Sequence, residues 1–131
     1  KLAYLGVPPM TSDFYDYIET RGAKIVFNEV RWEFSFPRYQ KAKNIYEQYL
    51  DYTYPYSMDF RLMNLEKDLD ERDITGIIHY TQKFCHRALD NIVLKEKLPY
   101  PLINIESDRE NKLDERTKIR LDAFIEMLKE Y

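Results

Sequence analysis

The sequence predicts an α/β fold in which a four-stranded parallel sheet is covered by helices on both faces. Short apolar runs alternate with longer segments in which apolar residues recur every three or four positions, as expected for strands alternating with helices. The apolar runs lack the two-residue alternation of half-exposed strands, so both faces of the sheet should be buried. Helical connections imply right-handed crossovers between parallel strands. We therefore expect a doubly wound sheet of the flavodoxin-like or Rossmann-like kind.

Four apolar runs are the predicted strands. The first covers residues 2–7 (LAYLGV) and ends at two prolines, and the second covers 23–27 (AKIVF). The third, 74–80 (ITGIIHY), is the most apolar, and the fourth covers 102–106 (LINIE). Ligands of such sheets collect beyond the carboxyl ends of the strands, so a functional site is expected in the connections that follow these runs.

The segments between the strands carry helical patterns. Helices are predicted over 12–22, with Ser12 and Gly22 as caps, and over 39–50, 58–72, 83–95 and 114–130. In 58–72 the expected buried positions are Phe60 and Met63. In 114–130 one face carries Leu121, Phe124, Ile125 and Leu128. Residues 28–38 (NEVRWEFSFPR) show no clear period and are predicted to form a loop.

Composition limits the possible classes of function. A chain of 131 residues with 44% apolar and 33% charged residues suits a single globular domain spanning 1–131. The net charge of −3, with basic and acidic residues mixed along the chain, gives no reason to expect nucleic acid or a membrane surface as partner. No apolar run approaches the roughly 18 residues of a membrane span. The three glycines form neither a dinucleotide fingerprint nor a P-loop.

Cys85 is the only cysteine and lies just after the third predicted strand. An internal disulfide is therefore impossible, and a reducing cytoplasm is the expected compartment. The spacing of Cys85, Ala88, Leu89 and Ile92 would place the thiol in a buried helical stripe. A position near a helix N-terminus would instead favour the thiolate, the form that binds metals. Position alone leaves both interpretations open.

Other residues near the strand ends are weaker candidates for a site. A nucleophilic cysteine paired with a histidine is disfavoured, because His86 is the direct neighbour of Cys85 and adjacent helical side chains point apart. His79, six residues earlier at a strand end, is the better geometric candidate, but a histidine in such a position is more often simply hydrogen-bonded. Glu106 and Asp108 could contact a substrate or be solvated loop carboxylates. Six tyrosines within 39–56 could form a docking surface, or the core stripe of a helix.

Two segments together resemble a known family. "GIIHYTQKFCHRALDNIVLKE" and "PLINIESDRENKLDERTKIRLDAFIEML" are similar to the C-terminal domain of the 2-hydroxyacyl-CoA dehydratase D-component and benzoyl-CoA reductase subunit family. The shared pattern is an apolar strand, a Phe-Cys pair, an acidic loop and a closing helix from Arg116 to Leu128. Upstream, "MTSDFYDYIETRGAKIVFNEV" extends the likeness over nearly the whole chain. Ser107 replaces the glycine that usually precedes the loop aspartate.

The resemblance implies a cofactor, a substrate and partners. Cys85 matches a ligand of a [4Fe–4S] cluster that is shared with an N-terminal domain, so the chain is expected to be the C-terminal domain of a longer subunit. The family eliminates water from 2-hydroxyacyl-CoA, or reduces aromatic acyl-CoA, through radicals, with a paralogous subunit and an ATP-dependent activator. A cubane needs about four ligands, so this chain alone is expected to be inactive and without iron. Catalytic residues cannot be assigned, while His79, Gln82, His86, Glu106 and Asp108 are possible contacts at the rim of the site. The alternative is a non-catalytic interaction domain associated with the activator.

Overall fold

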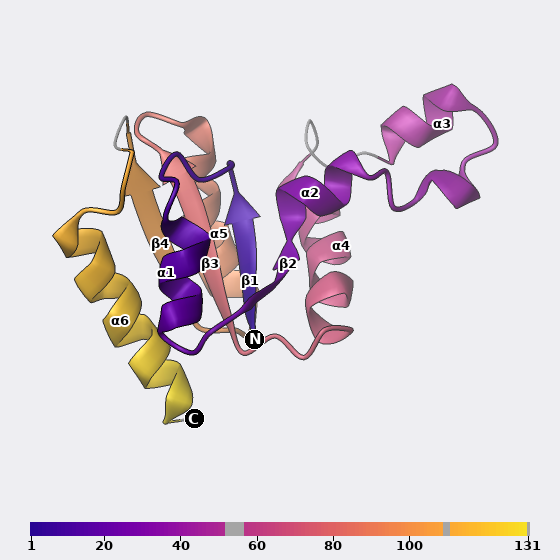
Figure 1. Cartoon of the computed structure of the whole chain (residues 1–131). Coiled ribbons are helices and arrows are strands. Elements are labelled where there is room, and N and C mark those ends of the chain that lie inside the picture. Colours follow the sequence, from indigo (N-terminus) through magenta and orange to yellow (C-terminus); the bar gives the residue numbers. More distant parts are fainter. Residues whose placement is uncertain (52–56, 109–110, 131) are drawn as a thin grey trace.

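A four-stranded parallel sheet forms the centre of the protein. The computed structural model describes residues 1–51, 57–108 and 111–130. The strands are β1 (Leu2–Gly6), β2 (Ile25–Asn28), β3 (Gly76–Gln82) and β4 (Leu102–Ser107), in the order β2-β1-β3-β4 (Figure 1). All three neighbouring pairs are parallel. The predicted fold class and its flavodoxin-like order are confirmed, and each strand overlaps its predicted apolar run.

Helices cover both faces of this sheet. They are α1 (Phe14–Thr20), α2 (Glu29–Phe34), α3 (Ile45–Leu50), α4 (Met58–Asp70), α5 (Asp90–Lys97) and α6 (Glu115–Lys129), with 3-10 turns at Tyr39–Lys41 and His86–Ala88. Side chains of α1 and α6 pack on one face, and those of α4 and α5 pack on the other. The sheet is therefore doubly wound, as predicted.

Aromatic rings dominate the face covered by α1 and α6. Tyr4, Phe14 and Tyr80 are fully buried there, with edge-to-face ring pairs at centroid distances of 5.3 Å (Tyr4–Phe14) and 5.7 Å (Phe14–Tyr80). Such pairs add about 1 kcal/mol each beyond the burial of their area. The predicted face of α6 is confirmed, since Leu121, Phe124 and Ile125 are buried.

On the face covered by α4 and α5, the predicted buried side of α4 is wrong. Met63 of α4 is 59% exposed, whereas Leu62, Leu65 and Leu69 are buried. Arg61 lies on the same side and is only 2% exposed. The stripe was assigned to the wrong side of the helix because a buried arginine interrupts its apolar pattern.

The segment predicted as a loop contains α2. Asn28 caps this helix, because its side-chain oxygen accepts a hydrogen bond from the Arg31 backbone N–H at 3.1 Å. The apolar period is missing because two of its three buried residues are acidic, Glu29 and Glu33. The sequence feature that could have predicted α2 is the capping residue Asn28 followed by the acidic Glu29 in the first turn.

The predicted helix over 39–50 is broken into the 3-10 turn and α3. In Figure 1, α3 lies apart from the sheet. Tyr39, Tyr46 and Tyr49 are 55%, 79% and 58% exposed, so they do not form a core stripe. The other three tyrosines of the run, at positions 52, 54 and 56, lie outside the described residues.

Candidate functional site

The carboxyl ends of β1 and β3 form the topological switch point of the sheet. These two strands are neighbours, and the chain leaves them toward opposite edges, to β2 and to β4. Ligands of doubly wound folds bind in the crevice at such a point. Gly6 ends β1 there with a φ of 102°, a conformation that glycine adopts without strain. The connection that carries Cys85 follows β3 at the same edge.

Cys85 precedes a 3-10 turn instead of opening a long helix. The predicted helix over 83–95 is wrong in its first half, because Phe84 has a φ of 62° and Cys85 is extended. The Cys85 backbone N–H donates to the Gln82 carbonyl at 3.0 Å, which closes a tight turn. Since α5 begins only at Asp90, the thiol does not lie in the first turn of that helix.

The interpretation of Cys85 as a member of a buried stripe is also wrong. Leu89 and Ile92, which would share that stripe, are 70% and 66% exposed. Cys85 itself is half-buried at the carboxyl edge of the sheet. The thiol therefore lies where a molecule above the sheet can reach it.

Four further predicted residues lie near this edge, at the ends of the neighbouring strands β3 and β4 or in the connections that follow them. Gln82 and His86 flank the Cys85 turn and are exposed, as is Glu106 of β4. Asp108 is half-buried, and its carboxylate lies 3.9 Å from the Lys83 ammonium. The structure gathers these side chains at one edge without joining them into a hydrogen-bonded cluster with Cys85.

His79 is separated from the others by complete burial on the face of α4 and α5. Its Nδ1 lies 3.4 Å from the Asn91 side-chain oxygen, and its Nε2 has no hydrogen-bond partner among the described residues. Burial, and after it the positive charge of Arg61, lower the pKa of His79 from 6.5 to about 4. His79 is therefore neutral at physiological pH.

The buried imidazole makes stability depend on pH. The folded pKa lies below that of the unfolded chain, so the unfolded state binds the proton first, and stability falls between about pH 6.5 and about pH 4. The loss is at most about 3 kcal/mol. Glu29 and Asp90, which also face His79, limit it by favouring the cation.

We expect His79→Gln to flatten the dependence of the unfolding free energy on pH in this window. Urea unfolding of wild type and variant at the same series of pH values measures the effect. His86→Gln, which removes the other, exposed histidine, should retain the wild-type slope. Equal slopes for wild type and His79→Gln would contradict the low pKa.

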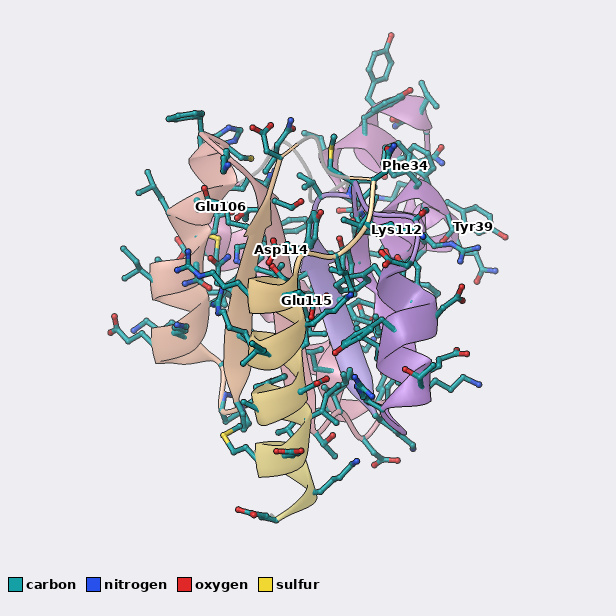
Figure 2. The ribbon with its side chains drawn as sticks, turned by 60° about the vertical axis from the view of Figure 1, so that its left-hand side comes forward. Phe34, Tyr39, Glu106, Lys112, Asp114 and Glu115 are labelled. Atoms are coloured by element: carbon teal, nitrogen blue, oxygen red, sulfur yellow. The ribbon has the colours of Figure 1, made fainter. Side chains whose placement is uncertain are left out.

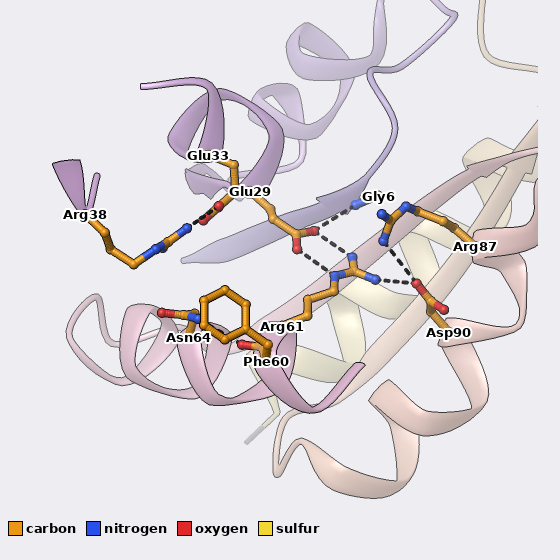
Figure 3. A network of polar contacts seen from close by, with 9 residues as sticks. All are labelled: Gly6, Glu29, Glu33, Arg38, Phe60, Arg61, Asn64, Arg87 and Asp90. Carbon is orange, nitrogen blue, oxygen red and sulfur yellow. Dashed lines mark hydrogen bonds and ion pairs between the residues drawn. The ribbon is translucent and has the colours of Figure 1, made fainter. Parts of the chain in front are cut away.

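A buried ionic network, which the sequence analysis missed, lies beside the switch point. Arg61 donates two hydrogen bonds to Glu29, at 2.6 and 2.7 Å, and one to Asp90 at 2.7 Å (Figure 3). Glu29 also accepts the Gly6 backbone N–H at 3.3 Å, and Arg87 lies 3.4 Å from Asp90. The side chains of Arg61 and Glu29 are 3% and 4% exposed. The pair is thus desolvated and geometrically fixed.

This network connects the Cys85 turn to the body of the protein. Glu29 comes from α2, Arg61 from α4, and Asp90 is the first residue of α5. Arg87, which also binds Asp90, lies two residues after Cys85. The ionic contacts therefore restrain the end of the connection that carries the thiol. The sequence feature that could have indicated a buried Arg61 is its four-residue spacing from Leu65, which places both residues on the same face of α4.

The described side chains could contribute one ligand to a metal cluster, but they do not form a complete metal site by themselves. The described residues contain no group of three or more His, Cys, Asp or Glu side chains arranged to hold a metal ion. Cys85 is the only thiol of the whole sequence. It is half-buried and at the edge of the sheet, as a ligand shared with another domain would have to be.

Comparison with known proteins gives one clear match. The family model described as 2-hydroxyglutaryl-CoA dehydratase, D-component, matches residues 1–128. No curated protein matches the chain. In the ranges that the structure describes, no helix has both the length and the apolar character needed to cross a membrane.

Proposed function

Because the chain belongs to the 2-hydroxyglutaryl-CoA dehydratase D-component family, we propose that Cys85 is one ligand of a [4Fe–4S] cluster in a 2-hydroxyacyl-CoA dehydratase. The remaining ligands come from cysteines outside these 131 residues, in an N-terminal domain. A paralogous subunit and an ATP-dependent activator complete the enzyme. The reaction is the radical elimination of water from the acyl-CoA thioester.

The observation that carries this proposal is the position of the thiol. The only cysteine lies half-buried beyond the carboxyl end of β3, at the switch point where doubly wound folds bind ligands. An inert structural cysteine would be expected inside the core instead. Leu89 and Ile92, the two large apolar residues that would share a stripe with Cys85, are exposed, so such a stripe does not explain its presence.

The chain's own residues hold the ligand in place. The hydrogen bond between the Cys85 N–H and the Gln82 carbonyl fixes the turn, and the Arg87–Asp90 contact ties its far end to α5. When bound, a low-potential cluster supplies the single electron that makes the hydrogen on C3 of the thioester removable. A rigid turn keeps the thiolate at one position throughout this transfer.

We expect Cys85→Ser to remove the iron and the visible iron–sulfur absorbance of the assembled dehydratase, together with its activity. The same change should cost less than about 1 kcal/mol in unfolding free energy, because a half-exposed position loses little packing. Iron and sulfide analysis of the complex and urea unfolding of the chain are the two measurements.

Thr81→Val is a control substitution near the same end of β3, at a residue that is not a cluster ligand. Thr81 is fully buried and its hydroxyl lies 3.4 Å from the Asn104 amide, so this variant should lose stability and keep its iron. A Cys85→Ser complex with unchanged iron would refute the ligand role and favour a non-catalytic interaction domain. A large loss of stability with intact iron would show that the thiol is structural.

A further inference from the structure

A cavity of about 560 Å³ lies between the end of β4 and the start of α6. Three cationic side chains line it, Lys83, Arg116 and Arg120. They come from two segments far apart in the sequence, the connection after β3 and the first two turns of α6. The cavity therefore lies at the carboxyl edge of the sheet, and Lys83 is only two residues from Cys85.

The three cations are only partly engaged by the protein. Among the described residues, no carboxylate forms an ion pair with Arg116. Within the described part of the chain, the Lys83 ammonium has one ion-pair contact, with Asp108 at 3.9 Å. Arg120 donates one hydrogen bond, at 2.6 Å, to the Asn104 carbonyl. Because a guanidinium carries five N–H donors, most of the donors on both arginines remain available.

Two acids also line the cavity, and they differ in their availability. Asp114 caps α6, since its carboxylate accepts hydrogen bonds from the Thr117 N–H at 2.7 Å and the Thr117 hydroxyl at 3.1 Å. These bonds, the one from the backbone foremost, lower the pKa of Asp114 and fix its charge at the helix end. Glu106 is exposed near the end of β4 (Figure 2). Even with both acids counted, three cationic side chains face two carboxylates in the lining of the cavity.

We propose that this cavity binds the phosphate groups of the CoA part of the substrate. Phosphate oxygens are acceptors that arginine forks bind with charge-assisted hydrogen bonds. Three cations spread over a large cavity suit a ligand with several phosphates better than a single carboxylate. The proposal rests on the proposed function, because an acyl-CoA that reacts beside Cys85 would place its phosphates near this edge of the sheet.

Isothermal titration of the complete protein with CoA tests this subsite. Removing the charges of Arg116 and Arg120 (Arg116→Gln with Arg120→Gln) should weaken CoA binding roughly tenfold or more. Arg31→Gln, which neutralises an exposed arginine on α2 away from the cavity, is the matched control and should leave the affinity unchanged. Glu106→Gln should tighten binding, because it removes a repulsive charge. Circular dichroism verifies that each variant is folded.

Truncated ligands identify the recognised group. We expect 3′,5′-ADP to compete with CoA, whereas pantetheine, which lacks phosphate, should not distinguish the double variant from wild type. Inorganic phosphate should compete weakly, and tight binding of phosphate alone would show a simple anion site and overturn the CoA assignment. The proposal is also overturned if wild type does not bind CoA, if the double variant binds it normally, or if Glu106→Gln weakens binding.

The outcomes separate this subsite from the role of Cys85. Normal CoA binding by the double variant, together with iron that depends on Cys85, would refute the phosphate subsite alone. Weakened CoA binding together with iron that survives Cys85→Ser would refute the cluster ligand alone.

Discussion

Replacing Arg61 by methionine should destabilise the protein by about 3–5 kcal/mol, because it leaves the Glu29 carboxylate buried without its counter-charge. Methionine keeps much of the length of the side chain, so lost charge and not lost volume decides the result. The one remaining described donor to Glu29 is the Gly6 N–H at 3.3 Å. Urea unfolding followed by circular dichroism measures the change.

Arg21→Met is the matched control for this substitution. The Arg21–Asp122 pair has a similar distance, 2.8 Å, but its side chains are 45% and 33% exposed. Water screens such a pair, so its loss should cost much less stability than the loss of the Arg61 pair. If the two substitutions cost the same, burial of the Arg61 pair is not what makes it important.

A double variant tests whether the lost charge is the cause. Arg61→Met combined with Glu29→Gln removes the uncompensated carboxylate and should recover much of the stability lost in Arg61→Met. Asp90 keeps its contact with Arg87 in this variant. No recovery would mean that the cost of Arg61→Met arises from repacking.

The same network explains which parts of the structure the sequence could predict. The strands were predictable because both of their faces are apolar, so that burial and hydrophobicity coincide. That coincidence fails where paired charges are buried. In α2 the buried positions of Glu29 and Glu33 are acidic, so the apolar residues show no helical period. In α4 the buried Arg61 interrupts the apolar face, so the wrong side of the helix was predicted to be buried. Patterns of hydrophobicity contain no information on which charges will find partners from distant segments.

The position of the candidate site in the fold was predictable, but its local geometry was not. Cys85 was expected beyond the third strand, and it lies there. The turn around it depends on a positive φ at Phe84, which the residue type disfavours and which only the surrounding structure imposes. The cavity at α6 depends on Lys83 meeting Arg116 and Arg120 across more than thirty residues of sequence, a proximity that no local pattern shows.

Gly6→Ala should destabilise the protein by more than about 3 kcal/mol, because it combines a steric clash with backbone strain. A Cβ at this position would lie 2.0 Å from the Tyr80 carbonyl oxygen, and φ is 102°. The clashing atom belongs to the backbone of β3, and it accepts the Val7 N–H at 3.0 Å. Neither strand can yield without breaking the pairing at the switch point.

Gly22→Ala separates the clash from the strain. Gly22 also has a positive φ, 75°, but the nearest atom to an added Cβ is the Lys129 Nζ at 3.9 Å. This variant should therefore show only the strain of a left-handed alanine, about 1–2 kcal/mol. Urea unfolding of both variants gives the difference, which measures how closely β1 and β3 approach where the chain turns toward Cys85. Equal losses would mean that strain alone explains Gly6, and that this end of the sheet has room for a side chain.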